Sequence, residues 1–275
     1  MIPNPLCGCR VCREAGKGGD RRDIRCRSAF LFDEHSLIDC GPDVISGCAR
    51  FGASLENLKR IFLTHSHSDH FSNVTLENLQ MCVTEPPKVK IYLSEAAYEG
   101  MMRLGRDLSE MSYATYKNEK WIKFCEYIPI EPFREYRDEE ITFYAVVGRH
   151  PGTFVNENSL NYLLKKDGHT LFYASDTGTY YEETYDFLSG FKLDTLIMEC
   201  TFGKRDLSVE SKHLNASQFL DTVHRLKEMG VVTDETEIYA THIGHKGDLL
   251  HTELERILQT RDGSNIHVAY DGLVI

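Results

Sequence analysis

Three imidazoles and one carboxylate lie within a stretch of six residues, His65-Ser66-His67-Ser68-Asp69-His70. Imidazole together with carboxylate is a ligand set that suits Zn²⁺, Mn²⁺ or Fe²⁺. In an extended chain, side chains two positions apart point the same way, so His65 and His67 can bind one ion. Asp69 and His70 lie beyond them, where we expect the chain to turn into a helix, and can face a second ion. A solvated polar loop is the alternative, but four ligand-type residues in this order rarely arise by chance.

Three further predicted strands are each followed closely by a residue that can bind a metal. These residues are His150 after the apolar run 141–147, Asp176 after 170–174 and His242 after 237–241. Loops that leave one edge of a sheet converge on a crevice. We therefore expect these three side chains to join the cluster that follows the strand 60–64. Taken alone, His150 and Asp176 are weak candidates, and it is their order and spacing that support them.

The ligand candidates need a framework of strands, and the apolar pattern predicts one. The predicted strands are 28–32 and 36–39 as a hairpin, 60–64, 89–93, 141–147, 160–164, 170–174, 195–198, 237–241 and 266–270. One predicted helix begins near Ser94, and two others span 216–229 and 249–258. Because strands cluster and helices alternate between them, the predicted class is α/β (α+β) with large mixed sheets. The polar and aromatic segment 105–126 has no clear assignment, and a substrate lid, a dimer surface and a packed insertion are all open.

The composition sets limits on the kind of protein this is. The chain has 275 residues, 41% hydrophobic and 27% charged, which is typical of a soluble globular protein and long enough for a single domain over residues 1–275. No apolar run approaches the ~20 residues of a membrane span, and the N-terminus lacks the pattern of a secretory signal. The net charge of −11 opposes binding to nucleic acid or to an anionic membrane. We therefore expect a cytoplasmic protein without a nucleic-acid or membrane partner.

A second set of metal-competent residues lies near the N-terminus, where Cys7, Cys9 and Cys12 form a Cys-x-Cys-x₂-Cys pattern. An odd total of nine Cys without a secretion signal argues against a disulfide scaffold. Three thiolates can wrap one tetrahedral ion, but a structural zinc site needs a fourth ligand. Cys26 is the local candidate and His245 the distant one. Three unpaired loop thiols are the alternative, although nothing else would order so irregular a segment.

The stretch from Thr64 to His70 resembles the dinuclear signature of the metallo-β-lactamase-fold hydrolases, and the later candidates follow in the order of that family. The resemblance covers nearly the whole chain. It implies a four-layer αββα sandwich of two mixed β-sheets flanked by helices, with two divalent metals (Mn²⁺, Zn²⁺ or Fe²⁺) at one edge. By motif match, one metal is held by His65, His67 and His150, the other by Asp69, His70 and His242, and Asp176 bridges the two.

The Cys pattern narrows the resemblance to the PhnP branch of this superfamily, whose members are phosphodiesterases. In that branch, three Cys and a His of a Thr-His-Ile-x-His motif, here 241–245, hold a structural zinc. The resemblance therefore favours His245 over Cys26 and makes residues 7–27 a zinc loop within the domain. Two more residues match by position: His213 as general acid or transition-state stabiliser, and Asp39 as a support for the metal ligands. A His at a helix N-terminus is the alternative for His213.

We predict from these features a dinuclear metal-dependent hydrolase that cleaves a phosphodiester, with a small cyclic phosphate as the expected substrate. A hydroxide bridging the two metals would be the nucleophile, because coordination brings the pKa of water from 15.7 toward ~7. His213 would protonate the leaving oxygen, and Asp69 is the second predicted catalytic residue. An arginine of the basic run 21–27 is a candidate for binding the phosphate, with a solvated surface as the alternative.

Three other functions stay open at this point. A tRNA 3′-processing-type ribonuclease would share the metal site, but the charge of −11 and the absence of a basic arm disfavour it. A β-lactamase or thioesterase is disfavoured by Asp69 and His213. An accessory protein of the pyrroloquinoline-quinone pathway would share the Cys-rich loop and hold one structural zinc, whereas the enzyme would hold three ions. The sequence does not decide the oligomeric state, and a homodimer is one assembly that it allows.

Overall fold

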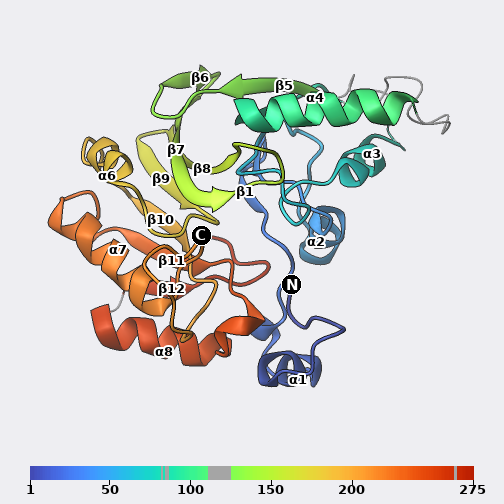
Figure 1. Cartoon of the computed structure of the whole chain (residues 1–275). Coiled ribbons are helices and arrows are strands. Elements are labelled where there is room, and N and C mark those ends of the chain that lie inside the picture. The colour runs from blue at the N-terminus through green and yellow to red at the C-terminus, as the bar shows by residue number, and fades with distance from the viewer. Residues whose placement is uncertain (82, 84–86, 111–124, 263–264) are drawn as a thin grey trace. The chain divides into compact units, whose positions relative to one another are not determined.

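The structure is a computed structural model that describes the chain except for residues 82, 84–86, 111–124 and 263–264. The chain forms two compact units. The seven-stranded unit comprises Met1–Cys26, Pro132–His150 and Asn161–Ile275, and the five-stranded unit comprises Arg27–Glu131 and Pro151–Leu160. Each unit is organised around one β-sheet (Figure 1).

The five-stranded unit holds a mixed sheet in the order β1-β2-β3-β4-β5. The strands are β1 (Phe30–Asp33), β2 (Ser36–Ile38), β3 (Arg60–Phe62), β4 (Val89–Ser94) and β5 (Cys125–Ile130). β1 and β2 form an antiparallel hairpin, whereas the other neighbouring pairs are parallel. Parallel neighbours need crossover connections. Helices in the connections of this unit are α2 (Val44–Phe51), α3 (Asn73–Met81) and α4 (Glu95–Glu110).

The core of this unit explains why β3 is a rigid starting point for the residues that follow it. All three residues of β3 are buried. Ile61 and Leu63 pack with Ile91 and Leu93 of the neighbouring β4 segment in one apolar cluster. Because a buried central strand has little freedom to move, the segment that begins at Thr64 leaves from a fixed point.

The seven-stranded unit holds a second mixed sheet, in the order β12-β11-β10-β9-β8-β7-β6. The strands are β6 (Tyr136–Asp138), β7 (Ile141–Pro151), β8 (Asn158–Lys166), β9 (His169–Ala174), β10 (Thr195–Glu199), β11 (Glu237–Thr241) and β12 (Ile266–Val268). The strands from β9 to β12 run parallel to one another, while β8 is antiparallel to β9 and β6 to β7. This half of the sheet therefore presents four carboxyl ends at one edge.

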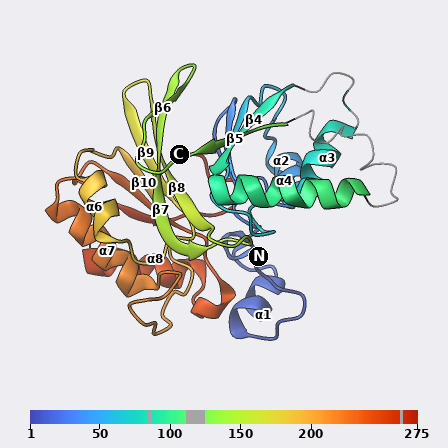
Figure 2. The same ribbon diagram turned by 45° about the horizontal axis from the view of Figure 1, so that its top comes forward.

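Helices α6 (Glu182–Leu188), α7 (Ala216–Glu228) and α8 (His251–Asp262) belong to the same unit, and α7 and α8 lie side by side (Figures 1 and 2). α7 begins with a capping box, in which the Asn215 side chain accepts from the Gln218 N–H and the Gln218 side chain accepts from the Asn215 N–H. The chain leaves α7 at Gly230, whose φ of 71° is left-handed. Phe219, Leu220 and Val223 of α7 are buried in the core against the sheet.

The predicted fold class is confirmed: two mixed sheets with associated helices form an α+β protein. One prediction is wrong, because residues 7–27 are not a wholly irregular loop. They contain α1 (Arg10–Gly16) and a 3₁₀ turn, Arg21–Asp23. Helices α2 and α6 and strands β5 and β6 also had no sequence prediction, whereas α3 begins three residues after His70, where a helix was expected. Most of the segment 105–126 lies outside the described residues, so its predicted roles stay predictions. The single domain over 1–275 likewise stays a prediction.

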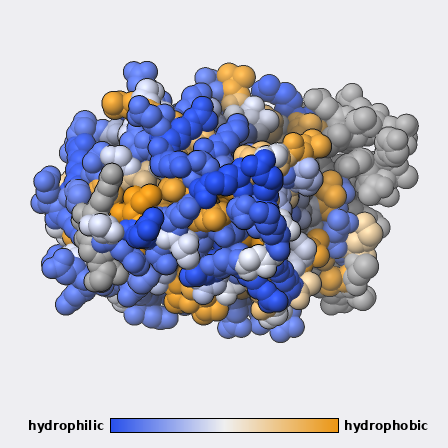
Figure 3. Space-filling view, turned by 90° about the horizontal axis from the view of Figure 1, so that it is seen from below, coloured by the Kyte–Doolittle hydropathy of each residue, from blue (hydrophilic) through white to orange (hydrophobic). Residues whose placement is uncertain are grey.

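The described helices include none that is long and apolar enough to cross a membrane. The face drawn in Figure 3 is covered mainly by hydrophilic residues, with small separate hydrophobic patches.

Candidate metal centre

The five-stranded unit gathers His65, His67 and His70 directly after β3. His65 is 1% and His70 0% exposed, and their ring centroids lie 4.2 Å apart. Nε2 of His65 lies 2.9 Å from Nδ1 of His67. Two ring nitrogens at this separation face one point, where they share either a proton or an ion, so this donor set fits a metal. Asp69 is more exposed, and its Oδ2 lies 3.9 Å from Nε2 of His70.

Asp39 supports this cluster from the end of β2. Its Oδ2 accepts a hydrogen bond of 2.6 Å from Nδ1 of His70, and its Oδ1 accepts one of 2.9 Å from the N–H of Thr64. A carboxylate that holds one ring nitrogen leaves the other nitrogen as the metal ligand. Asp39 is fully buried with a φ of 62°, a left-handed conformation that is uncommon outside glycine. The structure thus places Asp39 where it can fix the His70 tautomer.

The seven-stranded unit gathers a second cluster where three parallel strands end. Asp176 follows β9, Glu199 ends β10 and His242 follows β11, and the three strands are paired in register. His213, from the loop before α7, reaches the same place. The possible ligand atoms of Asp176, Glu199, His213 and His242 all lie within 4.8 Å of one another. Asp176 and His242 have φ values of 52° and 54°, so left-handed residues recur at this site.

His150, on β7, belongs to the same cluster. Its Nδ1 donates a 3.0 Å hydrogen bond to the carbonyl of Lys212, and its Nε2 lies 3.7 Å from Oδ2 of Asp176. Burial lowers the pKa of His150, because a desolvated imidazolium is disfavoured. A neutral imidazole with Nδ1 occupied by a carbonyl offers Nε2 as a ligand.

Glu199 is a residue that the sequence analysis missed. It is 0% exposed, and its Oε1 accepts from the N–H groups of Thr177 and Gly178 at 2.7 and 3.0 Å. Its Oε2 accepts a 2.9 Å hydrogen bond from Nδ1 of His213. Burial alone would raise the pKa of Glu199, but the hydrogen bond and charge of His213 hold that pKa below its ordinary value. The signal was present, since Glu199 ends an apolar strand as the ligand candidates do.

Thr201 connects this pair to His242. Its hydroxyl donates to Oε2 of Glu199, and its Oγ1 lies 2.9 Å from Nδ1 of His242. Since the one hydroxyl proton goes to the carboxylate, Oγ1 must accept from Nδ1–H of His242. Oδ1 of Asp176, 3.0 Å away, faces the same Nδ1. His242 therefore keeps its proton on Nδ1 and presents Nε2 as a lone pair, the form that binds metal.

A third cluster, also in the seven-stranded unit, consists of Cys7, Cys9, Cys12 and His245, whose ligand atoms lie within 4.8 Å of one another. Nδ1 of His245 is 3.4 Å from Sγ of Cys7 and 3.6 Å from Sγ of Cys9. A tetrahedral zinc with bonds of about 2.3 Å to sulfur and about 2.0 Å to nitrogen needs this spacing. The hydrogen bond from the Cys12 N–H, with further hydrogen bonds, lowers the pKa of Cys9 to about 6, which favours the thiolate.

The structure brings His245, and not Cys26, to the three thiols. His245 lies three residues after His242, so one segment serves both clusters of this unit. Gly244 allows the segment to pass closely: a Cβ there would lie 2.9 Å from the carbonyl oxygen of Thr201. The Gly244 N–H donates to that same oxygen at 3.0 Å.

A family model described as anti-Pycsar protein Apyc1 matches residues 29–247. The chain belongs to the Apyc1 family. The matched range contains every predicted active-site ligand and His213, while the three zinc-loop Cys precede it.

Solved structures show the fold of this Apyc1-family chain. A diphosphatase of the PhnP family aligns at 21% identity and a TM-score of 0.70, over 99% of this chain and 91% of its own. The metallo-beta-lactamase fold protein YhfI from Bacillus subtilis aligns at 23% identity and a TM-score of 0.64, over 90% of this chain and 91% of its own. Zn²⁺-bound PqqB from Methylobacterium extorquens aligns at 14% identity and a TM-score of 0.62, over 99% of this chain and 94% of its own. The predicted metallo-β-lactamase fold, with its likeness to the PhnP branch, is confirmed.

One curated protein, an octanoyltransferase from Porphyromonas gingivalis, is 30% identical over 141 residues. That stretch is 48% of the Apyc1-family chain but only 26% of the octanoyltransferase. The chain therefore spans about a quarter of the length of this relative.

Three of the four arginines in the basic run 21–27 of the Apyc1-family chain have partners inside their own units. Arg22 pairs with Asp20 at 2.8 Å, and Arg25 donates to the Ala269 carbonyl at 2.6 Å. In the five-stranded unit, Arg27 pairs with Asp43 at 2.8 Å. These contacts give the three arginines structural roles.

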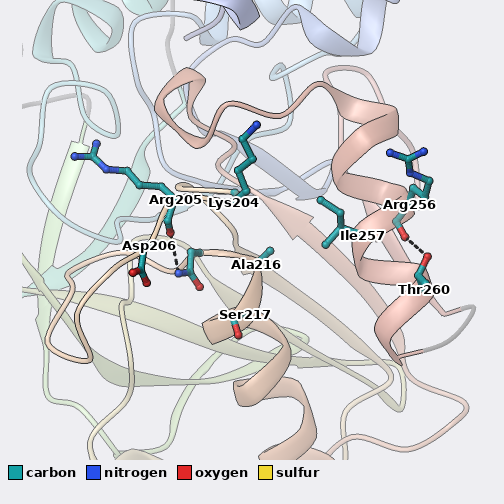
Figure 4. A pocket seen from close by; sticks show the side chains of 10 residues that line it. Lys204, Arg205, Asp206, Ala216, Ser217, Arg256, Ile257 and Thr260 are labelled. Carbon is teal, nitrogen blue, oxygen red and sulfur yellow. Dashed lines mark hydrogen bonds between the residues drawn. The ribbon is translucent and has the colours of Figure 1, made fainter.

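A pocket of about 740 Å³ lies in the seven-stranded unit beside α7 and α8 (Figure 4). Its lining includes the cations Lys204, Arg205 and Arg256 and the apolar Ile257, but none of the predicted ligands. In the Apyc1-family chain this pocket is therefore separate from the metal clusters of its unit.

Proposed function

We propose that the chain is a metal-dependent hydrolase that opens a small cyclic phosphodiester, with a cyclic nucleotide as the substrate class. The observation that carries the proposal is the oriented pair of Glu199 and His213, which lies within the carboxylate–imidazole cluster at the ends of β9, β10 and β11. The family membership supports the choice of substrate class.

The proposed metal ligands keep the assignment made by resemblance. His65, His67 and His150 would hold one ion, Asp69, His70 and His242 a second, and Asp176 would bridge them. Hydrogen bonds to Nδ1 of His70, His150 and His242 support this, because each leaves Nε2 as the ligand. When bound, the ions would supply an activated water and neutralise charge on the phosphate. The Cys₃His cluster would hold a structural zinc.

His213 would act as the general acid. Its Nδ1 proton is held by Glu199, so a second proton on Nε2 can be given to the departing ribose oxygen. The buried carboxylate stabilises the imidazolium before transfer and fixes the ring during it. Asp69, the more exposed member of its cluster, would orient the attacking water.

The charge of the chain favours a small substrate over a polymer. A cyclic phosphate carries one negative charge, whereas an RNA would bring many toward a protein of net charge −11. Ion binding would therefore attract the substrate locally, against the overall field.

The test is a substrate panel of cyclic nucleotides, a ribosyl cyclic phosphate, a bis-aryl phosphate and RNA, each with Mn²⁺ and with Zn²⁺. We expect hydrolysis of cyclic phosphates, its loss in Asp69→Ala, and wild-type activity in His224→Asn, an exposed histidine of α7. Three bound ions per chain are expected; a single zinc with no turnover would instead indicate an accessory protein. Full activity in Asp69→Ala with both metals retained would contradict the mechanism.

A further inference from the structure

One buried carboxylate of the five-stranded unit has no part in the proposed reaction and yet contacts the metal-binding segment. Glu157 is 3% exposed and lies 87 residues beyond His70 in the chain. We propose that Glu157 is a positioning residue that sets the geometry of the His65–His67 pair. The proposal rests on the proposed metal site and adds to it a residue that neither the motif nor the family match assigns.

The contacts of Glu157 converge on Ser66, the residue between the two histidines. Its Oε1 accepts from the Ser66 N–H at 2.7 Å, and its Oε2 accepts from the Ser66 hydroxyl. The N–H of Phe154 also donates to Oε2, at 3.1 Å. Three donors are thus directed at one buried side chain, and hydrogen bonds to a carboxylate are stronger than those to a neutral acceptor.

Thr153 completes the hold on Ser66. Its N–H donates to Oγ of Ser66 at 3.1 Å, and its hydroxyl donates to the Ser66 carbonyl at 2.9 Å. The amide, hydroxyl and carbonyl of Ser66 are thus all bonded to the segment 152–157. Since Ser66 joins His65 to His67, fixing its backbone fixes the direction in which the two rings leave the chain.

The segment 152–157 is itself rigidly built. The Gly152 N–H donates to the Glu157 carbonyl at 2.9 Å, and a Cβ on Gly152 would lie 2.0 Å from Cδ of Glu157. Phe154 packs over Gly100 of α4 so closely that a Cβ there would lie 2.1 Å from the ring. The carboxylate is therefore braced from two sides, as a residue that positions another must be.

Loss of this carboxylate has a defined consequence. In Glu157→Gln the shape remains, but an NH₂ group replaces an oxygen that accepts from the N–H of Ser66 or of Phe154. A donor left facing a donor in a buried place is unfavourable, so the contact between Ser66 and the segment 152–157 must rearrange. We expect metal affinity at the histidine site to fall roughly 10–100-fold, the range for residues that orient metal ligands.

The experiment measures metal binding by the full chain without substrate. Zn²⁺ and Co²⁺ affinities are determined by chelator competition, and Co²⁺ spectra separate the thiolate site from the histidine site. Glu157→Gln should weaken the histidine site and leave the Cys₃His site unchanged, while Glu99→Gln, an exposed carboxylate on α4, should change neither. Thr153→Val, which keeps the carboxylate, is a milder second variant if Glu157→Gln fails to fold, and it should shift affinity in the same direction.

Ser66→Ala supplies the decisive comparison. If Glu157 acts through Ser66, the double variant Glu157→Gln with Ser66→Ala should lose little more metal affinity at the histidine site than the worse of the two single variants. Wild-type affinity at the histidine site in Glu157→Gln, or fully additive losses, would overturn the proposal, as would a wild-type chain that binds no metal there. A chain that binds metal but hydrolyses no cyclic phosphate would refute only the proposed function.

Discussion

Nδ1 of His213 lies 2.9 Å from Oε2 of Glu199, and that carboxylate is fully buried at the end of a parallel strand. Its other oxygen is held by two backbone N–H groups, so the carboxylate cannot turn away. A histidine held in this way keeps a fixed tautomer and a fixed direction. The relationship gives the cluster a candidate acid–base pair beside its candidate metal ligands.

His213→Ala should lower kcat for a cyclic nucleotide by roughly 10²–10⁴-fold, the usual contribution of a general acid. Glu199→Gln should also lower kcat, because the ring loses the charge that stabilises its protonated form. An aryl phosphodiester, whose leaving group needs no proton, should lose far less in both variants. Steady-state kinetics on the two substrates provides the measurement, and equal losses on both would argue against proton donation by His213.

Thr201→Val should weaken metal binding and turnover together. The substitution keeps the volume but removes the oxygen that accepts from His242 and the proton given to Glu199. We expect a loss of roughly 10–100-fold in metal affinity at the site. Thr201→Ser, which restores the hydroxyl, should recover most of it. Isothermal titration with Zn²⁺ tests this, and a Val variant that binds as the wild type does would show the hydroxyl to be dispensable.

Cys9→Ser should remove the structural zinc and loosen the N-terminal segment. With free zinc at 100 times its Kd, a site that binds only the folded state contributes about 2.7 kcal/mol to stability. We expect that contribution to vanish, with faster hydrogen exchange in α1. The ion pairs of Arg10 with Asp248 and Glu253 should keep the segment partly docked. Zinc content and exchange rates are the measurements, with Cys48→Ser, outside the cluster, as the matched control.

Predictability from the sequence differed between residues for physical reasons. The predicted ligands could be proposed because each follows an apolar run, and strand ends meet at one edge of a sheet; His150 differs only in that β7 continues through it to Pro151. Glu199 fits the same rule but was overlooked. Glu157 could not have been found, because its contact with Ser66 spans 91 positions and has no local pattern. α1 was missed because it has only 7 residues and is capped by Cys9, a residue with no strong preference for that place.

A buried histidine away from the metal clusters should make stability depend on pH. The His251 N–H donates to Asp23 at 2.6 Å, and its Nδ1 lies 3.1 Å from the guanidinium of Arg25. Burial, followed by the charges of Arg25 and Arg22, lowers the pKa of His251 from an ordinary 6.5 to about 4. The titratable and charged groups around the ring are Arg25, Arg22, Asp20, Glu255 and Tyr270, and Asp23 binds the backbone N–H of the same residue.

Between pH 6.5 and 4 the unfolded chain binds a proton at His251 that the folded chain does not. As the pH falls through that window, the free energy of unfolding therefore falls by up to about 3 kcal/mol because of this group. The contribution is fully present only above pH 6.5. His251→Gln, which cannot take up the proton, should lack this part of the pH dependence. Denaturant unfolding of both proteins in chelator, at pH 7 and pH 5, measures the difference. Parallel pH dependence in the two proteins would mean that His251 titrates alike in the folded and unfolded states.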